Sequence, residues 1–169
     1  MTDAEQKNIL NTWLSQYKGL IFKIVRSYAF TVMDRDDLFQ EITVQIWRSI
    51  PTFRHACAIT TWLYRISLNT SIRFAQKERK RHESQTDIDS VSHILQDNPI
   101  PHDEKLSWLY DEISKLNEID RSITLLMLEG FSYKEMAAII GITETNIGVK
   151  INRIKKHLIT KSKKYDHGI

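Results

Sequence analysis

Three cationic side chains and one side-chain amide are spaced four residues apart in the sequence: Arg65, Asn69, Arg73 and Lys77. On a helix this spacing places them on one stripe, about one turn from each other. Cations bind phosphates, and an amide can both donate to and accept from a base edge. With the aromatic residues Phe53, Trp62 and Tyr64 nearby, the stripe is suited to an unpaired nucleic-acid strand, because aromatic rings stack on bases. The spacing alone fits an ordinary exposed helix face equally well.

A second group of cations lies near the end of the chain. Seven Lys or Arg residues and one acidic residue, Glu144, occur between Thr143 and Lys164. Such a charge run is usually a solvated face. When it forms the second helix of a helix-turn-helix, however, it is typical of a helix that enters a DNA major groove, because phosphate contacts dominate the affinity.

The residues that precede and space these cations have the pattern of a helix-turn-helix. Ser132 and Glu135 have the spacing of a capping box at a helix start. Gly141 fits the left-handed residue at which a helix ends. Thr143 then caps a second helix, whose apolar residues are spaced four, three and four apart: Ile147, Ile151, Ile154 and Leu158. Two amphipathic segments within 106–130 are expected to complete a small four-helix domain.

The stripe at Arg65 to Lys77 also needs a helix to carry it. Pro51 is expected to end a preceding helix, a loop to run to Ile59, and Thr60 or Thr61 to cap the next helix. The expected buried side of that helix is apolar: Trp62, Leu63, Ile66 and Phe74.

The preceding segment, 34–50, reads as an amphipathic helix. Its apolar residues share one face: Leu38, Phe39, Ile42, Ile46 and Ile50. Its other face mixes acidic, amide, apolar and basic side chains: Asp37, Gln40, Glu41, Val44, Gln45 and Arg48. This mixed face suits a protein partner better than DNA, although a merely solvated face explains the pattern equally well.

Composition and periodicity predict an all-α chain with two small helical domains. Only 5 glycines and 3 prolines occur among 169 residues, and apolar residues recur every three to four positions. Residues 84–104 contain five acidic residues, no Lys or Arg, and two of the prolines. This segment predicts a flexible acidic linker between domains at 1–83 and 105–169, although a long surface loop in one domain is the alternative.

Several classes of protein are excluded by the sequence. The lone cysteine, Cys57, leaves no disulfide framework and no four-cysteine metal site, and cytoplasmic location is the default expectation. No apolar run reaches the roughly 18 residues of a membrane span. The six histidines show no metal-ligand spacing, and no glycine loop for phosphate is present. We therefore expect no catalytic residues, no metal, no cofactor, no small-molecule substrate and no enzyme activity.

The order of these motifs resembles the extracytoplasmic-function (ECF) sigma factors of bacterial RNA polymerase. The resemblance rests on DDLFQEITVQIWR, then TWLYRISLNTSIR with a basic end, an acidic linker, and LNEIDRSITLLMLEGFSYKEMAAIIGITETNIGVKINRIKKHL. It covers about residues 8 to 160. It implies that 1–83 is sigma region 2, 84–104 a linker and 105–169 sigma region 4.

The resemblance implies a role for each surface. One set of residues would bind the clamp helices of the polymerase's largest subunit: Asp37, Gln40, Glu41, Gln45 and Arg48. Another would bind the promoter −10 strand, with Asn69 helping to receive a flipped base: Phe53, Arg54, Thr61, Trp62, Arg65, Asn69, Arg73 and Lys77. The acidic linker would thread through the RNA path of the polymerase and be mobile in the free protein. An anti-sigma factor is a further implied partner.

The second helix of the helix-turn-helix would recognise the −35 element as duplex DNA. Many relatives have Thr-Val-Lys-Ser-Arg after the turn, where this chain has a glycine in place of the first cation, Gly148. The −35 contacts are therefore expected to be distributed over other residues: Thr143, Glu144, Thr145, Asn146, Lys150 and Arg153. The rival function is a stand-alone helix-turn-helix regulator that binds a palindromic duplex as a dimer without polymerase.

Overall fold

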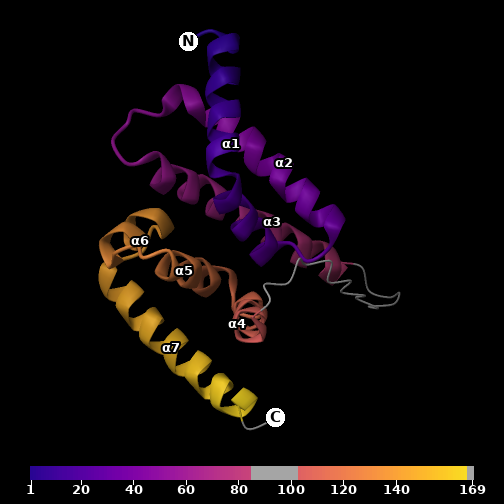
Figure 1. Cartoon of the computed structure of the whole chain (residues 1–169), viewed down its shortest axis with the longest axis vertical. Coiled ribbons are helices and arrows are strands. Elements are labelled where there is room, and N and C mark those ends of the chain that lie inside the picture. Colours follow the sequence, from indigo (N-terminus) through magenta and orange to yellow (C-terminus); the bar gives the residue numbers. More distant parts are fainter. Residues whose placement is uncertain (85–102, 167–169) are drawn as a thin grey trace. The chain divides into compact units, whose positions relative to one another are not determined.

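The computed structural model describes residues 1–84 and 103–166, and every regular element in these ranges is a helix (Figure 1). The all-α prediction is therefore confirmed for this part of the chain. The chain divides into two compact units, Met1–Pro99 and Ile100–Ile169, called unit 1 and unit 2 below. The predicted linker and its mobility fall almost entirely on residues outside the described ranges, so its boundaries stay a prediction. No described helix is long and apolar enough to cross a membrane.

Unit 1 is built from three long helices and one short 3-10 turn: α1 (Asp3–Tyr28), α2 (Val32–Ser49), η1 (Ile50–Thr52) and α3 (Ile59–Ser84). Thr2 and Thr31 cap α1 and α2, because their hydroxyls accept from backbone N–H groups of the first turn. Pro51 lies within η1, where its missing N–H costs no hydrogen bond. The predicted end of the 34–50 helix near Pro51 is thus confirmed, and an extended loop leads to α3.

The three long helices of unit 1 pack around one apolar core, since each contacts the other two. Its fully buried side chains come from all three: Ile21, Ile24, Leu38, Ile42, Ile46, Leu63 and Leu68. Where α3 faces both neighbours its buried side widens to include the small residues Ser67, Thr70 and Ser71, which let the helices approach closely. Gln6 ties α1 to the end of α2, because its Nε2 donates to the Trp47 carbonyl at 2.6 Å.

The start of α3 differs from the sequence prediction. The helix begins at Ile59, with the Trp62 N–H donating to the Ala58 carbonyl at 3.1 Å, so Thr60 and Thr61 lie inside the first turn. The prediction that either threonine caps this helix is wrong, because the helical hydrogen bonds start from the Ala58 carbonyl, two residues before Thr60. The predicted buried face is confirmed for Leu63 and Phe74, whereas Trp62 and Ile66 are only half-buried.

Unit 2 consists of four helices: α4 (Glu104–Ser114), α5 (Glu118–Leu128), α6 (Tyr133–Ile140) and α7 (Glu144–Asp166). This confirms the predicted four-helix arrangement. Buried residues from all four form its core: Ile113, Ile123, Leu126, Met136, Ile139, Ile147, Ile151 and Ile154. The rings of Trp108 and Tyr165 lie 5.5 Å apart and join α4 to the last turns of α7.

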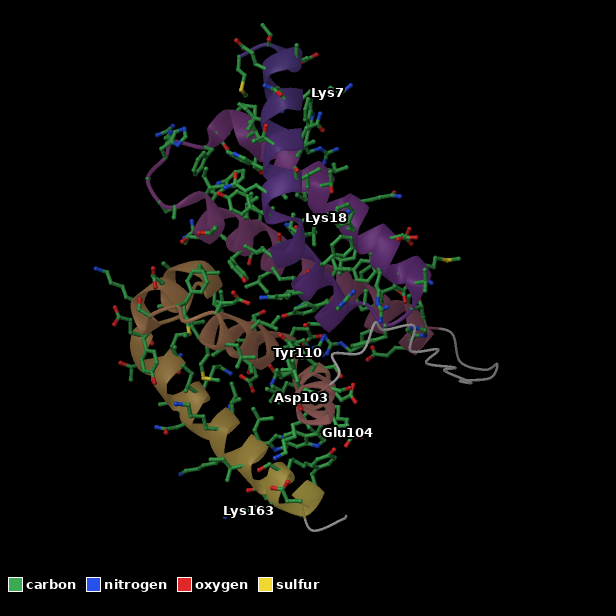
Figure 2. All side chains as sticks on the ribbon, viewed as in Figure 1. Lys7, Lys18, Asp103, Glu104, Tyr110 and Lys163 are labelled. Carbon is green, nitrogen blue, oxygen red and sulfur yellow. The ribbon has the colours of Figure 1, made fainter. Side chains whose placement is uncertain are left out.

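Charged side chains project from the outside of both units. Figure 2 shows Lys7 and Lys18 along α1, and Lys163 near the C-terminal end of α7. All three are exposed. Each unit thus has a largely apolar interior and a charged surface, and the positions that could bind nucleic acid are found among the exposed residues.

Candidate nucleic-acid interface

The turn between α6 and α7 has the geometry that the sequence predicts. The Ser132 hydroxyl accepts from the Glu135 N–H, and the Glu135 carboxylate accepts from the Ser132 N–H at 2.8 Å. The hydrogen bond from the Ser132 backbone N–H, and after it the interaction with the Ser132 hydroxyl, lower the pKa of the Glu135 carboxyl below its ordinary value. Gly141 ends α6 with φ of +84°, the left-handed conformation that favours glycine. Thr143 Oγ1 accepts from the Asn146 N–H at 3.1 Å and starts α7.

α7 buries one side and exposes the other. Three of its four predicted apolar residues, Ile147, Ile151 and Ile154, are buried, and the fourth, Leu158, is half-buried. The opposite side, called here the outer face of α7, consists of exposed residues: Thr145, Asn146, Val149, Asn152, Arg153 and Lys156. The sequence predicted DNA contacts for three of them: Thr145, Asn146 and Arg153. It did not predict contacts for the other three, Val149, Asn152 and Lys156, although their spacing from the buried isoleucines also indicates an exposed position.

Lys150 is engaged inside unit 2. Its Nζ lies 2.9 Å from Oδ1 of Asp120, an α5 residue that is only 8% exposed. The second carboxylate oxygen of Asp120 accepts from the Asn117 amide at 2.8 Å, and Asn117 in turn caps α5. This ion pair joins the first turn of α5 to α7. A DNA contact by Lys150 therefore has to break or share it, whereas Arg153 extends from the outer face.

Gly148 lies on α7 where the Tyr133 ring of α6 crosses the helix. A Cβ atom placed there would lie 3.5 Å from Cε2 of Tyr133, an ordinary contact distance. Replacing Gly148 by alanine is therefore expected to raise the free energy of unfolding of unit 2 by about 0.5–1 kcal/mol, because glycine loses more backbone entropy in a helix. Denaturant unfolding measures the change. Gly141→Ala is the opposing control, since its positive φ should make alanine destabilising; a loss of stability in Gly148→Ala would contradict the prediction.

In unit 1, α3 exposes all four residues of the predicted stripe: Arg65, Asn69, Arg73 and Lys77. They are called here the α3 stripe. Arg54 is exposed in the loop that precedes the helix, and Thr61 is half-buried in its first turn. Tyr64, in contrast, is 4% exposed and belongs to the core. The sequence prediction that Tyr64 lies among the base-stacking aromatics is therefore wrong, since its ring has no open face.

An aromatic cluster lies at the N-terminal end of α3. The Phe53 ring centroid is 4.9 Å from that of Trp62, 5.5 Å from that of Trp13 and 4.5 Å from that of His55. His55 adopts a positive φ of 55°, which turns the loop back toward Phe53. The sequence pointed to Phe53 and Trp62, but not to Trp13 or His55, because nothing in the local pattern of α1 shows that it meets this loop.

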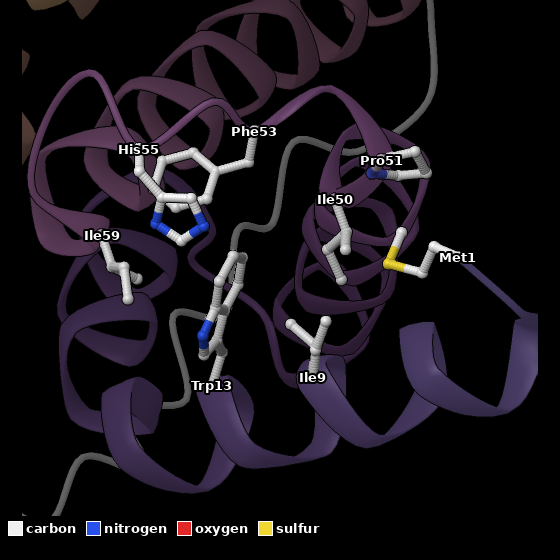
Figure 3. Close-up of a pocket in the computed structure, with 8 residues that line it drawn as sticks. All are labelled: Met1, Ile9, Trp13, Ile50, Pro51, Phe53, His55 and Ile59. Carbon is white, nitrogen blue, oxygen red and sulfur yellow. The ribbon is translucent and has the colours of Figure 1, made fainter.

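A pocket of about 520 Å³ opens beside this cluster (Figure 3). Its lining is mostly apolar: Met1, Ile9, Trp13, Ile50, Pro51, Phe53, His55 and Ile59. Figure 3 shows the His55 and Phe53 rings together on one side of it, with Trp13 below them. The pocket thus borders the loop that is expected to contact the −10 strand, and it offers aromatic surfaces with a single imidazole. In the described ranges, no group of three or more His, Cys, Asp or Glu side chains is placed to hold a metal ion.

The mixed face of α2 lies on the surface of unit 1. Asp37, Gln40, Glu41 and Arg48 are exposed and Gln45 is half-buried, while Leu38, Ile42 and Ile46 on the other side are buried in the core. Phe39 lies between the two faces, stacked at 5.1 Å on Phe22 of α1. The predicted division of this helix into an inner and an outer side is confirmed, and its outer side is accessible to a partner.

Comparison with known proteins assigns both units to one family. The model for Sigma-70 region 2 matches residues 13–81, and the model for Sigma-70, region 4 matches residues 106–158. The ECF RNA polymerase sigma-E factor of Haemophilus influenzae is 30% identical, over 92% of this chain and 88% of that protein. The sigma-E factor of Escherichia coli K12 is 27% identical, over 89% of this chain and 85% of that protein.

Solved structures support the same fold. The sigma factor RpoE from Bartonella quintana, in complex with the anti-sigma factor NepR, matches with a TM-score of 0.68 and 22% identity, over 88% of this chain and 92% of that one. CnrH, in complex with the cytosolic domain of CnrY, matches with a TM-score of 0.65 and 18% identity, over 93% and 89%. The two family models cover more than half of the sequence, and the relatives span nearly all of it. The chain therefore belongs to the sigma-70 family and, within it, to the ECF RNA polymerase sigma factors.

Proposed function

We propose that this chain directs core RNA polymerase to one class of promoters and helps to open their −10 region. The observation that carries the proposal is the presence of two exposed cationic surfaces on separate units, each within a segment that matches one sigma-70 region. Membership of the family implies core polymerase and promoter DNA as partners. The two surfaces would then contact two elements of the same promoter, which gives the polymerase a position and a direction on the duplex.

The proposed −10 contact uses the α3 stripe and the aromatic cluster beside it. Arg65 and Arg73 flank Asn69 by one turn each, so phosphates bound by the two cations would bring a base edge to the amide. Trp62 lies in the first turn of the same helix and Phe53 in the loop before it, with ring centroids 4.9 Å apart, and both rings would stack on or border an unpaired base. Arg54, Thr61 and Lys77 would extend the contact at its two ends.

The proposed −35 contact uses the first turns of α7. A recognition helix places its N-terminal residues against base edges, and Thr143, Glu144, Thr145 and Asn146 occupy this end. Arg153 lies two turns further along, where it would bind a phosphate or a guanine edge. Lys150 would contribute through the ion pair that fixes α7 on α5, or through a phosphate contact that competes with it.

In-vitro transcription with purified core polymerase tests the proposal. Core polymerase with this chain should initiate at promoters from its own genome, whereas core polymerase alone should not. The rival function, a stand-alone regulator, predicts tight binding to a duplex without polymerase and no new start sites with it. Sequencing the transcripts produced from a genomic DNA library distinguishes the two functions. Only a sigma factor would produce new start sites that share −10 and −35 elements upstream.

The proposed polymerase contact lies on the outer side of α2. Replacing Gln40 and Glu41 together by alanine is expected to weaken binding to core polymerase about tenfold, which corresponds to about 1.4 kcal/mol, because both side chains are exposed and removed from the core. Helical content should not change. Equilibrium binding to labelled core enzyme measures the effect. The matched control removes an exposed amide and an exposed carboxylate elsewhere in unit 1, Gln16→Ala with Glu83→Ala; equal affinities for the two variants would count against the assigned surface.

An anti-sigma factor is proposed as a further partner. In the two solved structures, the sigma factor RpoE is bound to the anti-sigma factor NepR, and CnrH is bound to the cytosolic domain of CnrY. Co-expression of this chain with its genomic neighbours, followed by affinity capture and inhibition of transcription, tests the idea. The proposed place of action is the cytoplasm, where polymerase acts, and the proposed role is regulatory, so the chemistry of RNA synthesis belongs to the polymerase.

A further inference from the structure

One apolar side chain lies at the centre of the outer face of α7. Val149 is two residues from both Ile147 and Ile151, which are buried, so it points roughly 200° around the helix from each of them. It is 57% exposed, although valine is among the residues most often found buried. Val149 therefore makes little contribution to the core of unit 2, and its side chain is accessible to a ligand on the outside of the helix.

The neighbours of Val149 are polar or cationic. Thr145 and Asn146 precede it by four and three residues, and Asn152 and Arg153 follow it by three and four, so all four surround it on the helix surface. Lys156 continues the same face one turn further. The adjacent residue, Gly148, has no side chain that would cover the valine. A ligand that reaches Val149 must therefore also match amides, a hydroxyl and cations, which describes a DNA groove better than an apolar protein surface.

The chemistry of the side chain then selects one feature of that groove. An isopropyl group has no hydrogen-bond donor or acceptor, so it cannot recognise the nitrogen and oxygen atoms of base edges. The C5-methyl group of thymine is the apolar feature of the major groove. We infer that Val149 contacts a thymine methyl, so that the −35 element contains a thymine at the base that faces the centre of α7. This inference rests on the proposed −35 recognition and adds a base to it.

The effect of the contact follows from its size. Burying one methyl group against an apolar side chain favours binding by about fourfold. The contact should therefore make one position of the −35 element prefer thymine over cytosine and over uracil, which differs from thymine only in this methyl. Val149→Ser removes the apolar partner and should erase that preference, while the exposed cations Arg153 and Lys156 are retained.

The experiment uses holoenzyme reconstituted from core polymerase and the full chain. A duplex library randomised over the −35 segment is selected for binding by wild-type and Val149→Ser holoenzymes, and each thymine of the selected element is then replaced by deoxyuridine. We expect one position at which uridine weakens binding of the wild type about fourfold and has no effect on Val149→Ser. Ile159→Ser is the control, because Ile159 is 54% exposed on the same helix but lies about 15 Å further along it.

Each outcome decides between the possibilities. In one outcome, a −35 element is selected, but at every thymine the replacement by deoxyuridine affects the wild type and Val149→Ser equally. This outcome overturns the inference and leaves the proposed −35 recognition standing. A library from which the wild-type holoenzyme selects no element overturns both. A Val149→Ser variant that binds DNA normally but loses affinity for core polymerase would show that a protein surface covers the valine, which also overturns the inference.

Discussion

Replacing Arg121 by methionine is expected to lower the free energy of unfolding of unit 2 by about 3 kcal/mol. Arg121 is only 7% exposed, and its Nη2 donates to the carbonyls of Ser114 and Leu116 at 2.7 and 2.8 Å. These carbonyls lie at the end of α4 and in the turn after it, where helix carbonyls have no partner within the helix. Methionine fills a similar space but donates no hydrogen bond, so both carbonyls lose a charged donor.

The loss is large relative to the stability of a unit of this size. Domains gain roughly 0.05–0.15 kcal/mol of stability per residue, so a unit that spans only Ile100–Ile169 has little reserve. Hydrogen exchange measured by mass spectrometry is the test: peptides from 103–166 should lose protection, whereas peptides from 1–84 should keep it. Arg153→Met is the control, because Arg153 is an exposed arginine in the same unit. Unchanged protection in Arg121→Met would show that other contacts hold the turn between α4 and α5.

The second large effect is expected at Asn69. Its side chain is exposed on α3, and its amide has no hydrogen-bond partner within the part of the chain that the structure describes. A role in fixing the fold of unit 1 would require such a partner, so the amide is available to a base. Asn69→Ala is expected to make the free energy of promoter opening less favourable by about 1–3 kcal/mol at the preferred sequence. It should also relax the base preference at one −10 position.

The neighbouring arginine provides the matched comparison. Arg73→Ala should weaken opening at all promoter variants alike and reduce the dependence of binding on salt concentration, because it removes a phosphate contact. Both variants are measured by in-vitro transcription from promoters in which each −10 base is changed in turn. If Asn69→Ala reduced transcription from every promoter by the same factor, Asn69 would be a positioning residue, and its assignment to a base would be wrong.

Features that depend on neighbouring residues were predictable from the sequence. The Ser132–Glu135 capping box, the left-handed Gly141 and the Thr143 cap each involve hydrogen bonds or backbone angles within a few residues, so their sequence pattern contains the whole cause. The division of α2 and α7 into buried and exposed sides was also predictable, because a helix with one packed side repeats its apolar residues every three or four positions.

Features that depend on distant residues could not be predicted. Lys150 and Asp120 are thirty positions apart, and the sequence shows two charges without showing that they meet. Trp13 reaches Phe53 only because α1 crosses the end of α3. Tyr64 was misplaced for a related reason: α3 packs against two helices, so its buried side is wider than the apolar pattern alone indicates.

The ion pair between Lys150 and Asp120 has a consequence for how promoter choice can evolve. A residue that joins α7 to α5 is constrained by the partner inside its own domain, so exchanging it removes this ion pair as well as any contact with DNA. Under the proposed −35 recognition, the exposed positions around it are constrained mainly by the DNA. We therefore expect relatives with different −35 targets to differ first at five exposed positions of one helix, Thr145, Asn146, Val149, Asn152 and Arg153, and less often at the paired Lys150 and Asp120.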